Sequence, residues 1–219
     1  MKADSLSKII IVTIFIPALT VFSQQSNLSK AVNLISEYIA SDYFKELKNN
    51  SDDLALVDSI FLKAVEFTNG DYSEALLCLT LSTIPYRQVP MIIPIFRAKI
   101  YYPLISADEK VFKIKNLNLP KYFFYDSPGD EYGDKDKLAH YFGNAFIRYS
   151  LDILDLSFLI GYFVEEFEEN FTVNSTINYR DIEANWYGDV FGSELKQNRR
   201  ILPSSILLHR SLRYIIISL

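Results

Sequence analysis

Residues whose side chains can do chemistry concentrate in the second half of the chain. Lys137, His140 and Asn144 share one face of a predicted helix, because residues three and four positions apart project in similar directions. Asp181 and Asn185 share a face of a later helical segment in the same way. An imidazole beside carboxylates can bind a divalent metal ion or transfer protons. These faces are therefore the candidate functional site.

Between these two segments, an apolar stretch ends in a cluster of acids. Residues 153–164 are apolar on nearly every side, and Glu165 and Glu166 follow directly. The pattern predicts a buried central helix, from which the Glu165 carboxylate projects into the core and needs a partner. His140, Glu165 and Asp181 are therefore the candidate ligands of a divalent metal ion.

Two glycines complete the pattern of the later segment. Gly188 and Gly192 share the helical face of Asp181 and Asn185. Each glycine costs a helix about 1 kcal/mol relative to alanine, so their presence favours close approach of another backbone to this face. The polar side chains of that face would then need partners inside an interface. The full candidate cluster comprises Lys137, His140, Asn144, Glu165, Glu166, Asp181 and Asn185.

Two interpretations of this cluster remain open. In one, it is a hydrogen-bonded network that fixes how three helices cross, with Lys137 or Arg148 neutralising the acids. In the other, it is the site of a metal-dependent or acid/base hydrolase that acts on an envelope component. We favour a structural or binding role, because ion-paired networks perturb pKa values without catalysing reactions.

The order of these residues resembles VanZ-like proteins over about residues 134–192. The resemblance rests on a DKxxH motif at 136–140, the acidic pair 165–166, a DxxAN motif at 181–185, and Gly188 and Gly192. VanZ-like proteins are membrane proteins with several spans, and some are associated with glycopeptide resistance. The resemblance implies that His140, Glu165 or Glu166, Asp181 and Asn185 form one cluster, and it supplies no reaction. The chain departs from the family in lacking convincing spans and in carrying an export signal.

The N-terminus has the pattern of a secretory signal peptide. Lys2 and Lys8 precede an apolar run over residues 9–22, which is too short to cross a bilayer because a span needs about 20 residues. Val21 and Ser23 suit positions −3 and −1 of a cleavage site before Gln24. We therefore expect residues 1–23 to be removed and residues 24–219 to form one periplasmic or extracellular domain.

The amino-acid composition limits the classes of partner that this domain can bind. The formal net charge is −5, whereas nucleic-acid binding requires clustered Lys and Arg, so we expect no nucleic-acid partner. An envelope component or another protein is the expected partner, and the terminal run 206–219 carries too few charges to favour membrane-surface contact. Cys78 is the only cysteine, so no intramolecular disulfide can form and the core must hold the fold. Its apolar neighbours predict a buried side chain.

Periodicity and proline spacing predict the remaining elements. Apolar residues at helical spacing predict helices over 28–49, 51–70, 71–83 and, more briefly, 107–117. Four prolines between 85 and 103 exclude a continuous helix and favour an extended segment or small hairpin near 88–104. The sequence therefore predicts a mainly α, single-domain helical bundle with a minor extended or β-hairpin element.

Overall fold

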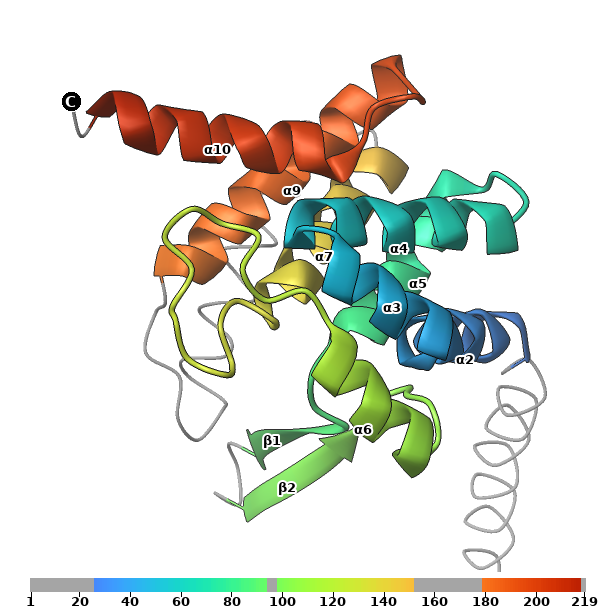
Figure 1. Ribbon diagram of the computed structural model, residues 1–219. Helices are drawn as coiled ribbons and strands as arrows, with labels where there is room; N and C mark the ends of the chain where they lie inside the picture. Colours follow the sequence, from blue (N-terminus) through green and yellow to red (C-terminus); the bar gives the residue numbers. More distant parts are fainter. Residues whose placement is uncertain (1–25, 94–97, 152–178, 218–219) are drawn as a thin grey trace, which may run out of the picture.

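The computed structural model describes residues 26–93, 98–151 and 179–217 and shows a mainly α fold with one two-stranded sheet (Figure 1). This confirms the predicted fold class. The predicted signal peptide, and the apolar segment that contains Glu165 and Glu166, lie outside the described residues. The elements in chain order are α2 (Ser26–Ala40), α3 (Asp42–Asn50), α4 (Asp53–Phe67), α5 (Tyr72–Thr83), β1 (Gln88–Ile93), β2 (Ala98–Pro103), α6 (Glu109–Asn118), α7 (Lys137–Ser150), α9 (Tyr179–Gln197) and α10 (Pro203–Ile217).

The prediction of a single helix over 28–49 is wrong in one respect, because Ser41 interrupts it and separates α2 from α3. Ser41 has extended backbone angles, and its hydroxyl accepts a hydrogen bond from the Phe44 N–H and donates one to the Tyr38 carbonyl. Serine is a favoured N-cap because its side chain satisfies an otherwise unpaired N–H of the first turn. Tyr43, the next apolar residue at helical spacing, is exposed after this interruption, and Phe44 is buried in the core instead.

The next two helices begin where the sequence indicates. Asp52 caps α4 by accepting from the Ala55 N–H, and Asp71 caps α5 by accepting from the Glu74 N–H. Gly70, with a φ of +85°, occupies the turn between them. A left-handed backbone angle of this kind favours glycine.

The predicted hairpin is present, and its prolines fit its hydrogen-bond pattern. β1 and β2 pair antiparallel with Pro90 opposite Tyr101, and the Leu104 N–H donates to the Arg87 carbonyl at 2.9 Å. Because hydrogen-bonded pairs alternate with non-hydrogen-bonded pairs, this register places Pro90 and Pro103 at positions where the ladder requires no N–H. The hairpin lies at the edge of the molecule opposite α10 (Figure 1).

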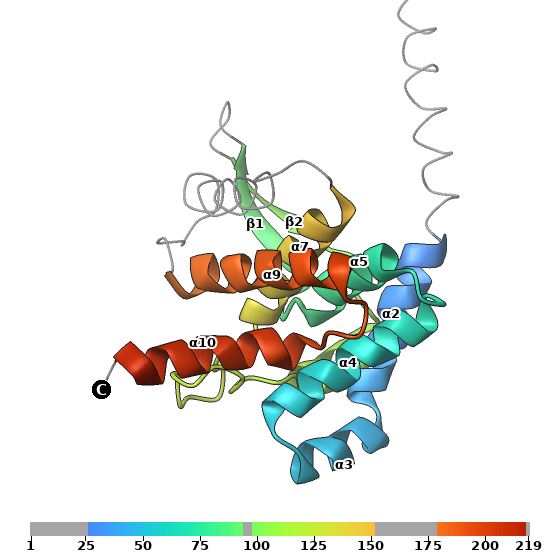
Figure 2. The ribbon, with the colours of Figure 1, turned by 90° about the horizontal axis from the view of Figure 1, so that it is seen from above.

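The second half packs against the first through α7, α9 and α10. α7 contacts both α5 and α9, and α10 contacts α4 and α9 (Figure 2). Ile206 and Leu207 on α10 are buried. The first half of α10 therefore contributes to the core. Within the ranges that the structure describes, the helices lack the length and hydropathy needed to cross a membrane.

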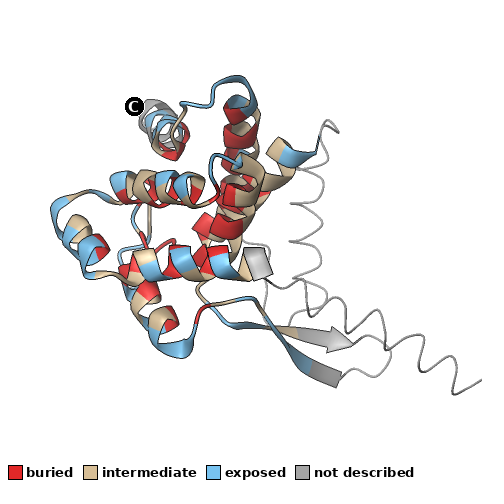
Figure 3. Cartoon of the chain, turned by 90° about the vertical axis from the view of Figure 1, so that its right-hand side faces the viewer, coloured by how far each residue is buried: buried red, intermediate tan, exposed pale blue. Residues whose placement is uncertain are grey.

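Aromatic side chains fill the centre of the bundle. The rings of Phe61 and Phe191 meet edge to face with centroids 5.3 Å apart, and Tyr141 stacks on Phe191 at 5.5 Å. Buried residues occupy the sides of the helices that face one another (Figure 3). Cys78 is fully buried among them, and this burial raises the pKa of its thiol to about 12. The thiol therefore packs as a small apolar group, as predicted.

Candidate functional site

A close contact between α7 and α9 supports the candidate site. A Cβ atom added to Gly192 would lie 2.5 Å from the Ala145 carbonyl oxygen, and one added to Gly188 would overlap the Tyr141 carbonyl. Only glycine allows backbones to approach this closely. The two glycines therefore let α7 and α9 pack with their polar faces in direct contact.

At the start of α7, Lys137 lies between two carboxylates. Its ammonium group contacts Asp136 Oδ2 at 2.6 Å and forms an ion pair with Asp181 on α9. Burial alone would lower the pKa of Lys137, but the two acids outweigh it and the pKa is raised. Lys137 is therefore a buried cation that links the two helices.

Asp136 precedes the first turn of α7 but does not cap the helix, because its carboxylate pairs with Lys137. Asp136 already has helical backbone angles, and its side chain makes no capping hydrogen bond. The sequence shows an acid at the helix start, but it does not show that a neighbouring buried lysine binds that acid.

One turn further along α7, His140 and Asn144 meet Asn185 of α9. Asn144 Nδ2 donates to Asn185 Oδ1 at 2.6 Å, and His140 Nδ1 lies 3.3 Å from the same oxygen. The other ring nitrogen, Nε2, lies 3.9 Å from Asp181 Oδ1. The imidazole therefore lies between the amide pair and the Lys137 ion pair.

The structure thus brings together Lys137, His140, Asn144, Asp181 and Asn185. Glu165 and Glu166 lie outside the described residues. Arg148, the other cation considered as a partner for the acids, faces Asp189 instead, with Nε 3.9 Å from Oδ1.

Only two of the three predicted metal ligands lie among the described residues. His140 and Asp181 could each supply one metal-ligand atom, but the Asp181 carboxylate is already paired with the Lys137 ammonium group. Among residues 26–93, 98–151 and 179–217, no group of three His, Cys, Asp or Glu side chains could hold a metal ion. The set His140, Glu165 and Asp181 stays a prediction because its third member is not described.

A cavity of about 340 Å³ opens beside the amide pair. Its wall combines three polar side chains of the cluster with residues from α7, from α5 and from the segment after α5. The lining residues are Thr80, Ile84, Tyr86, Ala139, His140, Gly143, Asn144, Phe146, Ile147 and Asn185. Most of the wall is apolar, and its hydrogen-bonding side chains include the network described above. Such a cavity can hold a compact ligand and orient it.

A larger groove of about 900 Å³ lies between α2, α3 and α4 and has a different character. Several of its polar side chains bind to protein groups: Tyr38 to Ser59 at 2.6 Å, Lys63 to Glu66 at 2.9 Å, and Asp58 to the Ser204 N–H at 2.8 Å. These groups already have partners, so the groove is a weaker candidate for specific recognition.

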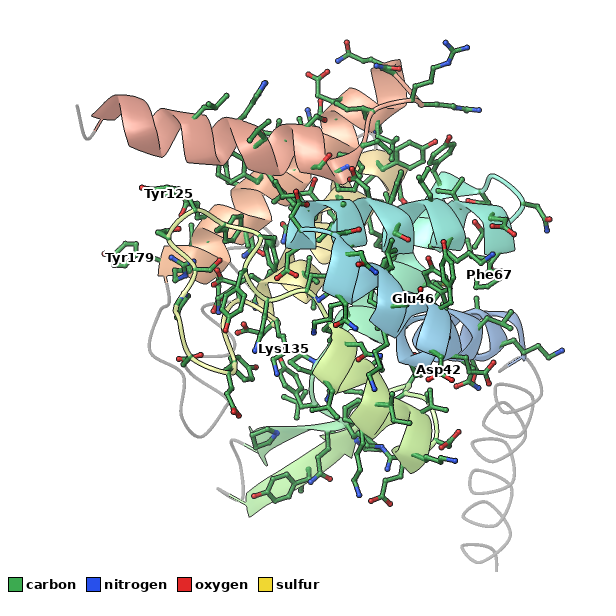
Figure 4. All side chains as sticks on the ribbon, viewed as in Figure 1. Asp42, Glu46, Phe67, Tyr125, Lys135 and Tyr179 are labelled. Atoms are coloured by element: carbon green, nitrogen blue, oxygen red, sulfur yellow. The ribbon has the colours of Figure 1, made fainter. Side chains whose placement is uncertain are left out.

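Sequence reasoning missed an ion cluster at the start of α9. Arg180 binds Asp134 with two hydrogen bonds of 3.0 and 2.6 Å, and Asp126 with one of 2.8 Å. Asp134 is fully buried, whereas Tyr125 and Tyr179 beside the cluster point outward (Figure 4). The cluster fixes the loop before α7 to α9. Because a loop has no periodicity, no sequence signal paired these residues.

The lining contributed by Thr80, Ile84 and Tyr86 was also missed, because these residues are distant in sequence from the cluster and carry no catalytic pattern.

No family model matches the chain, and no curated protein or solved structure is significantly similar to it. The resemblance to VanZ-like proteins therefore stays a prediction that rests on its short motifs.

Proposed function

We propose that this chain is an exported binding protein of the cell envelope, and that its ligand site is the cavity beside His140, Asn144 and Asn185. Export is supported by the signal-like sequence of residues 1–23. Binding is supported by the cavity itself, which carries the proposal. Its volume of about 340 Å³ lies in the range of ligand pockets, which are mostly apolar with a few polar groups.

The cavity wall indicates how such a ligand would be held. Contact with Ala139, Phe146 and Ile147 would remove apolar ligand surface from water, which contributes about 25 cal/mol per Å². The side chains of His140, Asn144 and Asn185 would give orientation rather than most of the affinity. We therefore expect a compact ligand with a largely apolar surface.

The arrangement of His140 supports binding over acid/base catalysis. One ring nitrogen faces Asn185 Oδ1 at 3.3 Å, and the other faces Asp181 Oδ1 at 3.9 Å. A general base must reach a substrate proton at about 2.6 to 3.2 Å, and the contact with Asn185 Oδ1 already engages one of the two ring nitrogens. The alternative is a metal-dependent or acid/base hydrolase, and titration with Zn²⁺ tests its metal-dependent form.

The proposal is tested by titrating the mature chain with 3-methylindole, a compact and largely apolar probe. Two-dimensional amide NMR spectra should show saturable shifts confined to α7, the end of α5 and the start of α9. In the variant Ala139→Trp a large ring fills the cavity, and the shifts should disappear.

The matched control is Leu62→Trp, which adds the same ring to the separate groove on α4. This variant should bind 3-methylindole as the wild type does. Absence of saturable binding in the wild type, or equal loss in both variants, would refute the proposed site.

A further inference from the structure

We propose that the groove between α2, α3 and α4 docks a basic amphipathic helix of a partner protein, whose apolar face enters the groove and whose cations face acids of this chain. The groove is separate from the cavity beside Asn144, so the inference does not depend on the proposed ligand site. It follows from the exposed apolar side chains of the groove, from its helical walls and from its charge.

Large apolar side chains from all three helices are exposed in this groove. Leu34 of α2, Tyr43 of α3 and Leu62 of α4 line it and are 44%, 64% and 53% exposed. The half-buried rings of Tyr38 and Phe67 extend the same apolar lining. Scattered exposed apolar residues are ordinary, whereas several that line one groove mark an interaction surface. The volume of about 900 Å³ leaves room for several side chains of a partner.

The helical walls determine the backbone form of the occupant. The N–H and C=O groups of an α-helix bond within that helix, so the walls offer no row of free backbone groups to an extended strand. The Tyr38 hydroxyl inside the groove is also engaged, with Ser59 at 2.6 Å. An occupant must therefore satisfy its own backbone hydrogen bonds, as an α-helix does. Such a helix is held by apolar side chains at positions i, i+3, i+4 and i+7 rather than by hydrogen bonds to the groove.

The charge of the lining favours a basic occupant. The charged lining residues are Glu37, Asp58, Lys63 and Glu66, which give a formal charge of −2. The single lysine of the lining is already neutralised, because Lys63 Nζ contacts Glu66 Oε2 at 2.9 Å. Glu37 is exposed and forms no ion pair within the ranges that the structure describes. Lys30 of α2 lies outside the lining.

The third wall, α3, adds to this excess of acid. Glu46 follows Tyr43 by three residues, so it projects near the groove side of α3. Lys45 follows Tyr43 by two residues and projects from the opposite side of the helix. Lys48 is directed at α6, where its ammonium group donates to the Leu117 carbonyl at 2.7 Å. Cations beside the apolar face of a partner helix would therefore meet acids, whereas an acidic helix would be repelled.

The test uses two synthetic peptides with the same apolar pattern and opposite charge. The basic probe is fluorescein-labelled LKKLLKLLKKLLKL, and the acidic probe has glutamate in place of every lysine. Fluorescence anisotropy with the purified protein should show saturable binding of the basic peptide. The acidic peptide should bind at least about tenfold more weakly, because its charges face Glu37 and Glu46.

A lysine placed in the groove should block the basic peptide. Leu62→Lys removes apolar contact and adds a repelling charge, so the affinity should fall about tenfold. Leu117→Lys is the matched control, because Leu117 is 75% exposed on α6 and lies outside the groove lining. It makes the same change in composition and charge, and it should bind the basic peptide as the wild type does.

A second pair of variants tests the contribution of charge. Glu37→Lys with Glu46→Lys should weaken binding of the basic peptide about fivefold at low salt and less at high salt, because exposed charges are screened. The control double variant, Glu131→Lys with Glu194→Lys, changes the net charge equally at exposed residues outside the groove lining. It should keep the wild-type affinity.

Absence of saturable binding, equal binding of the two peptides, or equal loss in Leu62→Lys and Leu117→Lys would overturn the inference. Sedimentation of the protein alone tests a second copy as the occupant. Self-association that Leu62→Lys abolishes would assign the groove to that copy and also overturn the inference. Ala139→Trp, which fills the separate cavity, should bind the basic peptide normally, so the inference and the proposed function can fail independently.

Discussion

Replacing Gly192 with alanine tests the contact between α7 and α9 on which the candidate site depends. The new Cβ would lie 2.5 Å from the Ala145 carbonyl oxygen and 3.0 Å from the Arg148 Cβ. Comfortable contact between such atoms requires about 3.5 Å. The carbonyl belongs to the backbone of α7 and cannot rotate away, so the two helices must separate by roughly 1 Å.

The magnitude follows from two opposing terms. Overpacking of this kind costs about 1 to 3 kcal/mol, and a clash with backbone belongs at the upper end of that range. Alanine returns about 1 kcal/mol through its higher helix propensity. We therefore expect Gly192→Ala to lower the free energy of unfolding by about 2 kcal/mol, which corresponds to a fall in Tm of about 4 to 8 °C for a domain of this size.

Urea denaturation followed by circular dichroism measures this change, and Gly129→Ala provides the control. A Cβ at Gly129 would meet no atom within 4 Å, and its backbone angle is not left-handed, so its stability should change by less than about 0.5 kcal/mol. If Gly192→Ala proved as stable as the wild type, the close approach of α7 and α9 would be refuted. If it unfolded more easily but bound 3-methylindole unchanged, the cavity would not depend on this contact.

Three further predictions concern buried charges. Burial lowers the pKa of Lys115 to about 7 from 10.5, so the unfolded state binds more protons between these values. The free energy of unfolding should therefore gain a contribution that rises from pH 7 to 10, and denaturation of Lys115→Met should lack it. Arg180→Met leaves the buried Asp134 carboxylate unpaired and should cost about 3 kcal/mol by urea denaturation. Part of this loss should return in the double variant with Asp134→Asn, and no recovery would contradict the pairing. Calorimetric titration with Zn²⁺ should show no micromolar binding, because Lys137 occupies the Asp181 carboxylate. Stoichiometric binding would overturn this and support the predicted metal set.

Local signals in the sequence predicted much of the fold. Asp52 and Asp71 mark the starts of α4 and α5, and the prolines between 85 and 103 indicate the hairpin. Each signal acts within about one helical turn or one strand, so its meaning does not depend on the rest of the chain. The N-cap at Ser41 also has a local cause, but the helical spacing of Ile39 and Tyr43 across it favours a single helix in the sequence, although Tyr43 is exposed in the structure.

The sequence also predicts one part of the candidate site and leaves another part open. Helical periodicity alone places Lys137, His140 and Asn144 on one face of a helix, and Asp181 and Asn185 on another. Periodicity cannot show which faces meet or which group pairs with which. The pairing of Lys137 with Asp136 and Asp181 is set by three-dimensional distance and by loss of solvent.

The sequence by itself predicted a mainly helical chain, an export signal, two polar helical faces and glycines that allow close packing. Only the tertiary structure decided that α7 and α9 press these faces together, that Arg180 binds a buried Asp134, and that a cavity opens beside Asn144. The physical reason is the separation along the chain over which each interaction acts. Helix periodicity and capping act between neighbours in the chain, whereas burial, charge pairing and cavity shape arise from residues that only folding brings together.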